Sequence, residues 1–454
     1  MFADRRILII GMARSGIAAA RLLLKAGAKV TVNDIKTLDK FNGALDDIIA
    51  AGALDSLGIP PDSLVDESDM IVISPGVPMD LPFIQKARES GKEIIGELEL
   101  ASLFLKGMLV AVTGTNGKST TVTLVGEIFK NAGKLSYVAG NIGLPFSDVV
   151  DGIKTEDVAV VEVSSFQLES IKSFRPHCAA VLNLREDHLN RHETMENYIA
   201  IKMRIFENQK SGDYAVLNYD DELIRANAKG FSAKKVWFSS TQKVSFGVWV
   251  EGDSIVYGSP GASRVVCAVS DVLLPGRHNL ENALAATAMA AVCGVQLPVI
   301  RHTLKTFSGI EHRIETVEEI AGVRYINDSK GTNVDATIAA VKAMDRPTVI
   351  LLGGYDKHTD FGPLSRVVKG SSVRAAVLLG QTKEQIKTSL QENGFDEIEM
   401  AQGFEEAVLK AKDMAVFGEN VLLSPACASF DMFKDFEERG RAFKEIVCRL
   451  KESL

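Results

Sequence analysis

Runs of apolar residues alternate with amphipathic stretches at the start of the chain. The run RILIIG (6–11) is followed by SGIAAARLLLKAG (15–27), whose apolar residues recur at helical spacing, and then by KVTVNDI (29–35). Short apolar runs are typical of buried strands, and apolar residues at helical spacing are typical of a helix that covers a sheet. The run MIVISPGVP (70–78) ends at a tight turn, and open α/β sheets bind ligands at the carboxyl ends of their strands. We therefore predict a parallel, helix-covered sheet with a ligand site at this turn.

The same alternation continues through the rest of the chain. Further strand runs are VAVVEV, CAAVLNL, DYAVLNY, TVILLGG, AAVLLG and NVLLS, and NLENALAATAMAAVCG is helical in pattern. We expect βα alternation to resume at HRIETVEEIAGVRYINDSKGTN (312–333) and the last 22 residues (433–454) to form an amphipathic helix with Phe433, Phe436 and Phe443 inward. We predict three α/β domains, over residues 1–97, 98–307 and 308–454.

Composition excludes several classes of function. The chain has 454 residues and a formal net charge of −8, which argues against a nucleic acid as the main partner, because phosphate backbones require a basic face. The five cysteines are scattered without CxxC spacing and predict a reducing compartment, the cytoplasm. Neither a signal peptide nor an apolar run long enough to span a membrane is found in the sequence.

The stretch VAVTGTNGKSTT (110–121) carries the first chemical signal. An apolar strand run enters a turn with Gly114 and Gly117, whose backbone N–H groups can surround an anion, and Lys118 adds a positive charge. Ser119 or Thr120 can offer a hydroxyl to Mg²⁺. The usual phosphate-loop pattern has a further glycine where this chain has Val112. An ATP or GTP site is favoured over a glycine turn before an ordinary helix.

Polar residues follow two of the middle strand runs. Glu162 ends an apolar strand, where a carboxylate is costly unless it pairs or binds a metal, so it is a candidate Mg²⁺ ligand. His188, in REDHLNRH, either binds a metal or caps a helix. Asn183, just before that motif, either binds a phosphate or shapes the turn.

Glycines and lysines at other strand ends give weaker signals. The N-terminal GMARSG has dinucleotide-type spacing with Ala13 in place of the middle glycine, which argues against NAD and leaves a nucleotide-sugar diphosphate or a plain helix-start turn. Asp34, after the second strand run, is a candidate for a ribose hydroxyl. In the third domain Lys330 and Lys357 follow strands, either as an anion pocket or as solvated loops.

Together these motifs resemble the Mur ligase family, ATP-dependent amide-forming ligases of peptidoglycan precursor synthesis. The resemblance covers essentially the whole chain, through GTNGKST, EVSSFQL, LNLREDHLNRH, GRHNLENALAA, HRIE, NDSKGTN, LLGGYDK and SPACASFDMFKDFEERG. In this family the shortened loop is a signature. The resemblance implies a Rossmann-like N-terminal domain, a P-loop ATPase-like central domain and a Rossmann-like C-terminal domain that binds the amino acid and closes on ATP.

Within the family, SPGVP and the closing SPACASFDMFKDFEERGRAF are similar to members that add D-glutamate to UDP-N-acetylmuramoyl-L-alanine, and no DNPR motif of the diaminopimelate-adding members is present. The resemblance then implies catalytic roles for Lys118, Glu162, His188 and Lys202. It implies two Mg²⁺ ions, one on Ser119 and Glu162 and one on His188 and a carbamylated Lys202. Unmodified, Lys202 would repel metal and be an exposed helix residue.

The remaining roles also rest on the resemblance. ATP would be held by Gly114, Thr115, Asn116, Gly117, Lys118, Ser119, Thr120, Asn279, Asn282, Arg313, Asp328 and Lys330. The UDP-sugar would be held by Arg14, Ser15, Asp34, Gly76, Asn141 and His188, although Ile35 lacks the hydroxyl that some members place after the second strand. D-Glutamate would be held by Thr332, Lys357, Ser429 and Phe430.

The implied reaction proceeds through an acyl phosphate, with hinge closure near Ser308 and Gly309 on ATP binding. We expect a monomer whose partners are small-molecule substrates. The rival interpretations are a P-loop kinase or NTPase switch, a non-catalytic nucleotide-sugar binding protein, and another family ligase such as a folylpolyglutamate synthetase.

Overall fold

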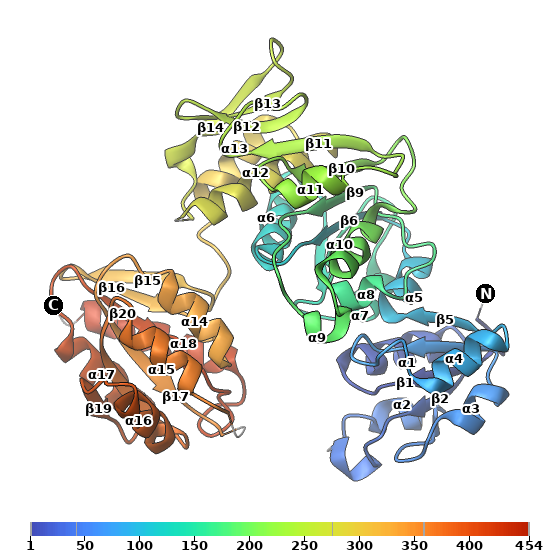
Figure 1. Cartoon of the computed structure of the whole chain (residues 1–454), viewed down its shortest axis with the longest axis horizontal. Coiled ribbons are helices and arrows are strands. Elements are labelled where there is room, and N and C mark those ends of the chain that lie inside the picture. Colours follow the sequence, from blue (N-terminus) through green and yellow to red (C-terminus); the bar gives the residue numbers. More distant parts are fainter. Residues whose placement is uncertain (1, 42, 275, 357–358, 453–454) are drawn as a thin grey trace. The chain divides into compact units, whose positions relative to one another are not determined.

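The computed structural model describes residues 2–41, 43–274, 276–356 and 359–452, which contain three sheets (Figure 1). The first sheet is parallel throughout, in the order β3-β2-β1-β4-β5. Its strands are β1 (Arg6–Ile10), β2 (Lys29–Asn33), β3 (Leu54–Asp55), β4 (Met70–Ile73) and β5 (Glu93–Gly96). Its helices are α1 (Arg14–Lys25), η1 (Leu38–Phe41), α2 (Asp46–Ala50), α3 (Asp62–Glu67), α4 (Pro82–Glu89) and α5 (Glu97–Phe104). The parallel sheet predicted for this region is confirmed.

The second sheet has the order β14-β13-β12-β11-β10-β9-β6-β8-β7 and is parallel from β7 to β12. Its strands are β6 (Met108–Thr113), β7 (Ser136–Gly140), β8 (Val158–Glu162), β9 (Cys178–Val181), β10 (Tyr214–Asn218), β11 (Lys234–Ser239), β12 (Gly247–Glu251), β13 (Ser254–Gly258) and β14 (Arg264–Ala268). The helices are α6 (Lys118–Asn131), α7 (Phe146–Val149), η2 (Val150–Gly152), α8 (Ser165–Leu168), α9 (Leu189–His192), α10 (Met195–Met203), η3 (Arg204–Phe206), α11 (Glu222–Asn227), η4 (Val269–Asp271), α12 (Arg277–Val292) and α13 (Leu297–Thr306). The last three strands form an antiparallel meander that the sequence pattern did not predict.

The third sheet has the order β15-β16-β20-β17-β18-β19. Its strands are β15 (Glu315–Ile320), β16 (Val323–Asn327), β17 (Thr348–Gly353), β18 (Val373–Leu379), β19 (Ile398–Met400) and β20 (Asn420–Leu423). Its helices are α14 (Val334–Lys342), α15 (Gly362–Lys369), α16 (Lys383–Glu392), α17 (Phe404–Met414) and α18 (Phe436–Glu452).

Two expectations for this last region are corrected. The domain opens with an antiparallel hairpin, β15 and β16, where we expected βα alternation. Ala321 and Gly322, both at positive φ, form its two-residue turn, a conformation that matches the twist of hairpin strands. The final helix begins at Phe436, so Phe433 precedes it and packs on the Phe404 ring 4.9 Å away, whereas Phe443 is fully buried in the core.

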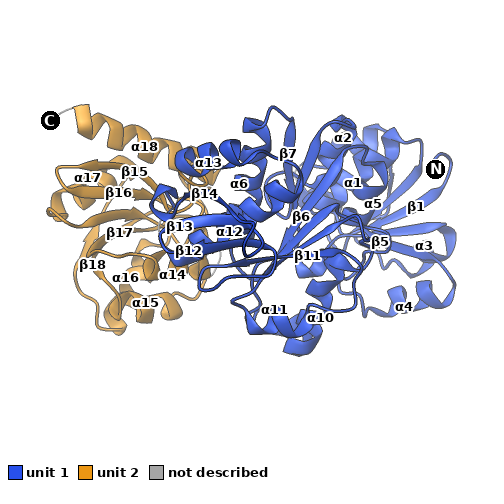
Figure 2. Cartoon of the chain, turned by 90° about the horizontal axis from the view of Figure 1, so that it is seen from above, with its two compact units in different colours: residues 1–307 blue, residues 308–454 orange. Residues whose placement is uncertain are grey.

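The cores explain why the pattern was informative. Strands β4, β8 and β9 are buried along their whole length, so they read as continuous apolar runs, whereas α1 buries one face and reads as amphipathic. By their internal contacts the described residues divide into two compact units, Met1–Phe307 and Ser308–Leu454 (Figure 2). The first unit holds the first two sheets. The three-domain division at residues 97 and 307 stays a prediction in its detail.

A buried carboxylate lies where the first two sheets meet along the chain. Glu97, the first residue of α5, is 1% exposed, and its Oε1 accepts a hydrogen bond of 2.6 Å from the backbone N–H of Ser147. Among the described residues, its Oε2 and the Ser147 hydroxyl have no hydrogen-bond partner. Burial therefore raises the pKa of Glu97 to about 7.

No helix among the described residues is long and apolar enough to cross a membrane. All five cysteines are free thiols, and Cys178, Cys267 and Cys427 are buried.

Candidate active site

The phosphate loop joins a buried strand to a long helix. Strand β6 runs through Val112, which is fully buried, to Thr113, and α6 begins at Lys118. The position that usually carries a loop glycine is therefore a strand residue in this protein. Gly117 adopts a left-handed φ of 83° as the N-cap of α6, and no side chain caps this helix start. The first N–H groups of the helix thus face the loop, as anion binding requires.

Two predicted lysines meet at one carbonyl oxygen of this loop. Lys118 Nζ donates to the Gly114 carbonyl at 2.9 Å and to the Thr115 carbonyl at 2.7 Å, and Lys202 Nζ donates to the same Gly114 oxygen at 3.0 Å. Lys202 is 2% exposed in the last turn of α10, which corrects the expectation of an exposed residue. Burial first, and then the charge of Lys118, lowers the pKa of Lys202 to about 7.

Glu162 links the phosphate loop to the next loop in the sheet. It ends β8 and is 3% exposed. Its Oε2 accepts a hydrogen bond of 2.7 Å from the Ser119 hydroxyl, and its Oε1 accepts one of 2.8 Å from the Asn141 amide. These two bonds satisfy a carboxylate that burial would otherwise penalise. They bring together residues predicted separately for metal, ATP and UDP-sugar.

His188 lies at the start of α9 with a left-handed φ of 54°. Its side chain does not cap that helix, which removes support from one of the two sequence interpretations. The ring lies 4.8 Å from the Phe166 ring, and Nε2 lies 3.4 Å from Asp187 Oδ2. Within the described ranges, no hydrogen bond joins His188 to Ser119, Glu162 or Lys202.

The described residues contain no cluster of three or more His, Cys, Asp or Glu side chains suited to a metal ion. A site for Mg²⁺ does not need one, because Mg²⁺ commonly binds through one or two carboxylates together with substrate phosphates. The Ser119–Glu162 pair offers a hydroxyl and a carboxylate, both hard oxygen ligands. The residues present therefore fit a Mg²⁺ ion.

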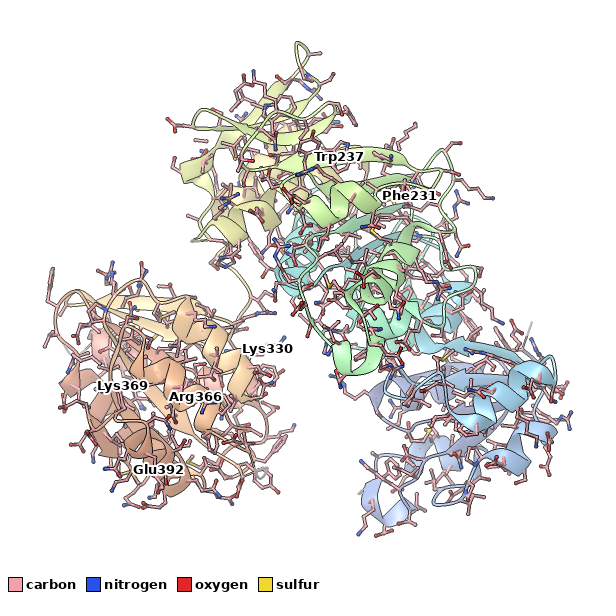
Figure 3. All side chains as sticks on the ribbon, in the orientation of Figure 1. Phe231, Trp237, Lys330, Arg366, Lys369 and Glu392 are labelled. Atoms are coloured by element: carbon pink, nitrogen blue, oxygen red, sulfur yellow. The ribbon has the colours of Figure 1, made fainter. Side chains whose placement is uncertain are left out.

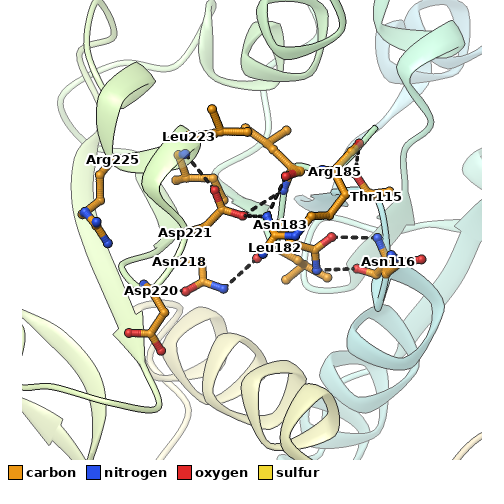
Figure 4. Close-up of polar contacts among 12 residues, drawn as sticks. Thr115, Asn116, Leu182, Asn183, Arg185, Asn218, Asp220, Asp221, Leu223 and Arg225 are labelled. Carbon is orange, nitrogen blue, oxygen red and sulfur yellow. Dashed lines mark hydrogen bonds and ion pairs between the residues drawn. The ribbon is translucent and has the colours of Figure 1, made fainter. Parts of the chain in front are cut away.

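Asn183 braces the phosphate loop (Figure 4). Its side-chain oxygen accepts a hydrogen bond of 2.8 Å from the Asn116 backbone N–H, and its amide donates to the Asn116 carbonyl at 3.0 Å. Thr115 is held in turn, since its hydroxyl accepts from the Arg185 backbone N–H at 2.9 Å and lies 3.0 Å from the Tyr198 hydroxyl. The contacts favour the interpretation that Asn183 shapes the turn. Tyr198 was not singled out from sequence.

A cavity of about 640 Å³ opens at the carboxyl ends of β1 and β4 in the first sheet. Its lining includes five of the six residues predicted for the UDP-sugar: Arg14, Ser15, Asp34, Gly76 and Asn141. His188 is not among the lining residues, and Gln167, Leu81 and Phe83, which sequence reasoning missed, are. A size of 300 to 1,000 Å³ is typical of small-molecule sites.

Two of the lining residues are already engaged in local contacts. The Asp34 carboxylate accepts from the backbone N–H groups of Met12, at 2.7 Å, and Lys36, at 3.0 Å. The Arg14 guanidinium donates to the Gly143 carbonyl. At the start of α1, next to Arg14, Ala13 supplies no side-chain cap, which leaves the helix N-terminus directed at the cavity.

The remaining predicted ATP residues fall in both units, each described by itself. In the first unit, Asn282 is buried, its amide donates to Asn279 Oδ1 at 3.2 Å, and its side chain lies beside Gly117. In the second, Asp328 is buried, and burial raises its pKa to about 7. Asp328 accepts from the Ser424 hydroxyl at 2.7 Å. Arg313 precedes β15, and its positive charge lowers the pKa of Asp328, an effect smaller than that of burial.

The predicted amino-acid site lies at the carboxyl ends of strands in the third sheet. Lys330, which is labelled in Figure 3 and was predicted for ATP, lies in the loop after β16. Its Nζ lies 5.9 Å from the Phe436 ring centroid. Thr332 is part-buried in the same loop, Ser429 is buried and Phe430 is 60% exposed. Lys357 lies outside the described residues.

Comparisons with known proteins identify the family. The Mur ligase MurD-like N-terminal domain matches residues 5–96, the Mur ligase middle domain matches residues 112–290, and the Mur ligase glutamate ligase domain matches residues 312–427. Proteins named UDP-N-acetylmuramoylalanine–D-glutamate ligase from Alkaliphilus oremlandii and Pelotomaculum thermopropionicum are 47% and 48% identical, each over 99% of both chains.

Solved structures agree in fold. The UDP-N-acetylmuramate–alanine ligase MurC of Thermotoga maritima has a TM-score of 0.56 at 21% identity, covering 99% of this chain and 100% of its own. MurF of Acinetobacter baumannii has a TM-score of 0.58 at 16% identity, covering 96% and 93%. From the domain matches and the full-length relatives, the chain belongs to the Mur ligase family.

Proposed function

We propose that this chain joins D-glutamate to UDP-N-acetylmuramoyl-L-alanine, with ATP converted to ADP and phosphate, in peptidoglycan precursor synthesis. One observation carries the proposal: the Glu162 carboxylate accepts hydrogen bonds both from Ser119 of the phosphate loop and from Asn141 of the cavity wall. A nucleotide loop and an acceptor cavity joined in this way suit an enzyme that phosphorylates a group on the bound acceptor. The names of the full-length relatives support the identities of acceptor and amino acid.

On the nucleotide side, the loop from Gly114 to Thr120 would bind the β- and γ-phosphates through its backbone N–H groups. Lys118, which here donates to two loop carbonyls, would turn from them to the phosphate oxygens. Asn279 and Asn282 would approach the adenine, and Arg313, Asp328 and Lys330 would reach the ribose and phosphates. Arg14, Ser15, Asp34, Gly76 and Asn141 would hold the UDP-sugar, with His188 near its reactive end.

Ser119 and Glu162 would hold one Mg²⁺, and His188 and a carbamylated Lys202 a second. Bound Mg²⁺ neutralises phosphate charge that would otherwise repel an incoming carboxylate. The low pKa of Lys202 supports the modification, because only a neutral amine reacts with carbon dioxide and a pKa of about 7 leaves much of the amine neutral near pH 7. Carbamylation replaces a cation with an anionic oxygen ligand, which suits a hard metal ion.

The chemistry has two steps. An oxygen of the terminal carboxylate of the acceptor attacks the γ-phosphorus, the bond to the β-phosphate oxygen breaks, and ADP leaves with an acyl phosphate formed. The amine of D-glutamate then attacks the acyl carbon through a tetrahedral intermediate, phosphate leaves and the nitrogen loses a proton. Lys118 offsets the charge of the transferred group in the first step.

The amino-acid site is proposed at Thr332, Lys357, Ser429 and Phe430. Hydroxyl and ammonium groups suit the two carboxylates of glutamate. The buried Ser429 and the part-buried Thr332 follow strands of the same sheet, β20 and β16, which supports a shared site at that edge.

The decisive test measures phosphate release from ATP in the presence of UDP-N-acetylmuramoyl-L-alanine and a panel of L- and D-amino acids. We expect D-glutamate alone to stimulate release, and Lys118→Ala to abolish the stimulation. Stimulation by a different amine would contradict the assigned amino acid but keep the ligase class. Phosphate release at the same rate with and without every amino acid would point to a kinase or NTPase switch. Full activity of the Lys118→Ala protein would contradict a nucleotide role for the loop.

We also infer a cytoplasmic location and a monomeric state. The location is supported by the need for ATP and by five free thiols. Sedimentation equilibrium of the purified chain tests the monomer, and a mass of twice 49.1 kDa would contradict it.

A further inference from the structure

Arg191 lies outside every proposed ligand set, yet its side chain joins several walls of the site. It belongs to α9 and is only 16% exposed. Its guanidinium pairs with Glu169, through Nε to Oε1 at 3.1 Å and through Nη2 to Oε2. Glu169 follows α8 directly, so this pair ties α9 to the segment after β8.

The same guanidinium reaches the first sheet. Arg191 Nη2 donates to the Val77 carbonyl at 3.1 Å. Val77 belongs to the turn after β4 and lines the proposed UDP-sugar cavity. A single planar group thus holds a carboxylate of the second sheet's domain and a carbonyl of the cavity wall.

Two ring contacts lead from Arg191 to His188, the candidate metal ligand. The guanidinium carbon lies 4.7 Å from the Phe166 ring centroid, and the Phe166 ring lies 4.8 Å from the His188 ring. Gln167, the next residue after Phe166, lines the cavity. The orientation of the His188 ring and the shape of the cavity wall therefore both depend on the Arg191 side chain.

We propose that Arg191 is a positioning residue that sets the Val77 turn and the His188 ring in one geometry, and so links binding of the UDP-sugar to binding of the metal. The inference rests on the proposed function. Lysine cannot substitute, because a point charge lacks both the fork that spans Glu169 and Val77 and the plane that stacks on Phe166.

Arg204 provides a matched control. It braces the same segment, with Nη1 donating to the carbonyls of Leu168 and Glu169 at 2.7 and 2.9 Å, and it pairs with Glu207. None of its hydrogen bonds within the described residues goes to Val77, and its guanidinium forms no ring contact with Phe166. Arg204→Lys therefore removes comparable bracing without touching the cavity turn or the ring stack.

The experiment compares Arg191→Lys with Arg204→Lys in the full chain. We expect Arg191→Lys to raise the KM for UDP-N-acetylmuramoyl-L-alanine and the Mg²⁺ concentration for half-maximal activity about tenfold each, with the KM for D-glutamate unchanged, since groups that orient metal ligands typically contribute 10- to 100-fold. Calorimetric titration of the metal-free protein with the UDP substrate should show a weaker Kd for Arg191→Lys only. We expect Arg204→Lys to change the melting temperature alone.

Phe166→Leu separates the effect on the metal from the effect on the UDP-sugar. It removes the ring contacts to Arg191 and His188 and keeps the hydrogen bonds of Arg191 to Glu169 and Val77. It should raise the Mg²⁺ requirement and leave the metal-free Kd near that of the parent protein. If Arg191→Lys matches Arg204→Lys in every kinetic and binding constant, Arg191 is only structural and the inference fails. Loss of D-glutamate-dependent phosphate release in the parent protein would instead refute the proposed function.

Discussion

At the residue scale, Asn183 shows how one side chain sets the shape of the phosphate loop. We expect Asn183→Ala to raise the KM for ATP roughly tenfold, because the loop N–H groups lose their fixed direction. Its stability cost should be about 1 kcal/mol, as the site is part-exposed. Steady-state kinetics and denaturant unfolding measure the two effects.

Asn218 supplies the control for that substitution. It is also a strand-end asparagine with two hydrogen bonds, but its amide donates to the Leu182 carbonyl, not to the loop (Figure 4). Asn218→Ala should lower stability at least as much and leave the KM for ATP unchanged. Equal KM values for the two variants would contradict a loop-specific role for Asn183.

Glu97 gives the residue-scale prediction for pH. Its folded pKa, raised to about 7, exceeds the ordinary value of 4.5, so its favourable contribution is complete below pH 4.5 and is lost as pH rises through 7. The shift corresponds to a loss of at most about 3 kcal/mol at high pH. The difference in free energy of unfolding between Glu97→Gln and the parent protein should therefore favour the variant more at pH 8 than at pH 5. Denaturant unfolding of both proteins at each pH measures this difference.

Glu99, two residues further on, is the matched control. It is also buried, but its carboxylate accepts from the backbone N–H groups of Lys172, Ser173 and Phe174 and from the Ser173 hydroxyl. Glu99→Gln, which removes an acceptor of these four hydrogen bonds, should destabilise the protein at pH 8. A Glu97→Gln protein that loses stability as Glu99→Gln does would show that Glu97 is ionised at little cost.

At the element scale, the position of Val112 in β6 explains the shortened loop. Val112→Gly, which restores the usual loop pattern, should lower the free energy of unfolding by about 2–4 kcal/mol, since it removes a fully buried side chain and loosens a central strand. It should not lower the KM for ATP. Val112→Ala separates lost packing from glycine flexibility, and tighter ATP binding by Val112→Gly would contradict this account.

The elements predicted from the sequence are those whose burial leaves a recognisable apolar pattern. A parallel strand buried on both faces, such as β4, is a continuous apolar run, and a helix buried on one face, such as α1, has apolar residues at helical spacing. The hairpin strand β15, with sequence ETVEEI and mostly part-exposed residues, lies at a sheet edge and lacks a continuous apolar run, so it was missed. Lys202 was misjudged because only tertiary packing shows that the last turn of α10 is covered.

Some of the residues predicted for the site are also in contact in the structure, for a related reason. Ser119 lies in the first turn of α6, Glu162 ends β8 and Asn141 follows β7, so the topology gathers these polar residues at one sheet edge. The bracing residues Arg191 and Tyr198 contact Val77 and Thr115, which lie far from them along the chain, and no spacing in the sequence encodes such contacts.

At the scale of the whole molecule, residues predicted for ATP come from both compact units, Met1–Phe307 and Ser308–Leu454. We expect ATP binding to draw the units together about the segment near Gly309, whose φ of 112° suits glycine. The radius of gyration in solution scattering should fall when a non-hydrolysable ATP analogue, Mg²⁺ and the UDP substrate are added. An identical scattering curve with and without these ligands would contradict closure.

The Glu162 carboxylate has one consequence for the order of events. Since its two oxygens accept hydrogen bonds from residues proposed for two different substrate sites, we expect the occupant of either site to alter the hydrogen bonding offered to the other. Thermodynamic reciprocity then requires that each ligand change the affinity of the other by the same factor. Through Glu162, the affinity for ATP would therefore depend on whether the acceptor is bound, so that ATP binds most tightly when an acceptor is present to receive its phosphate.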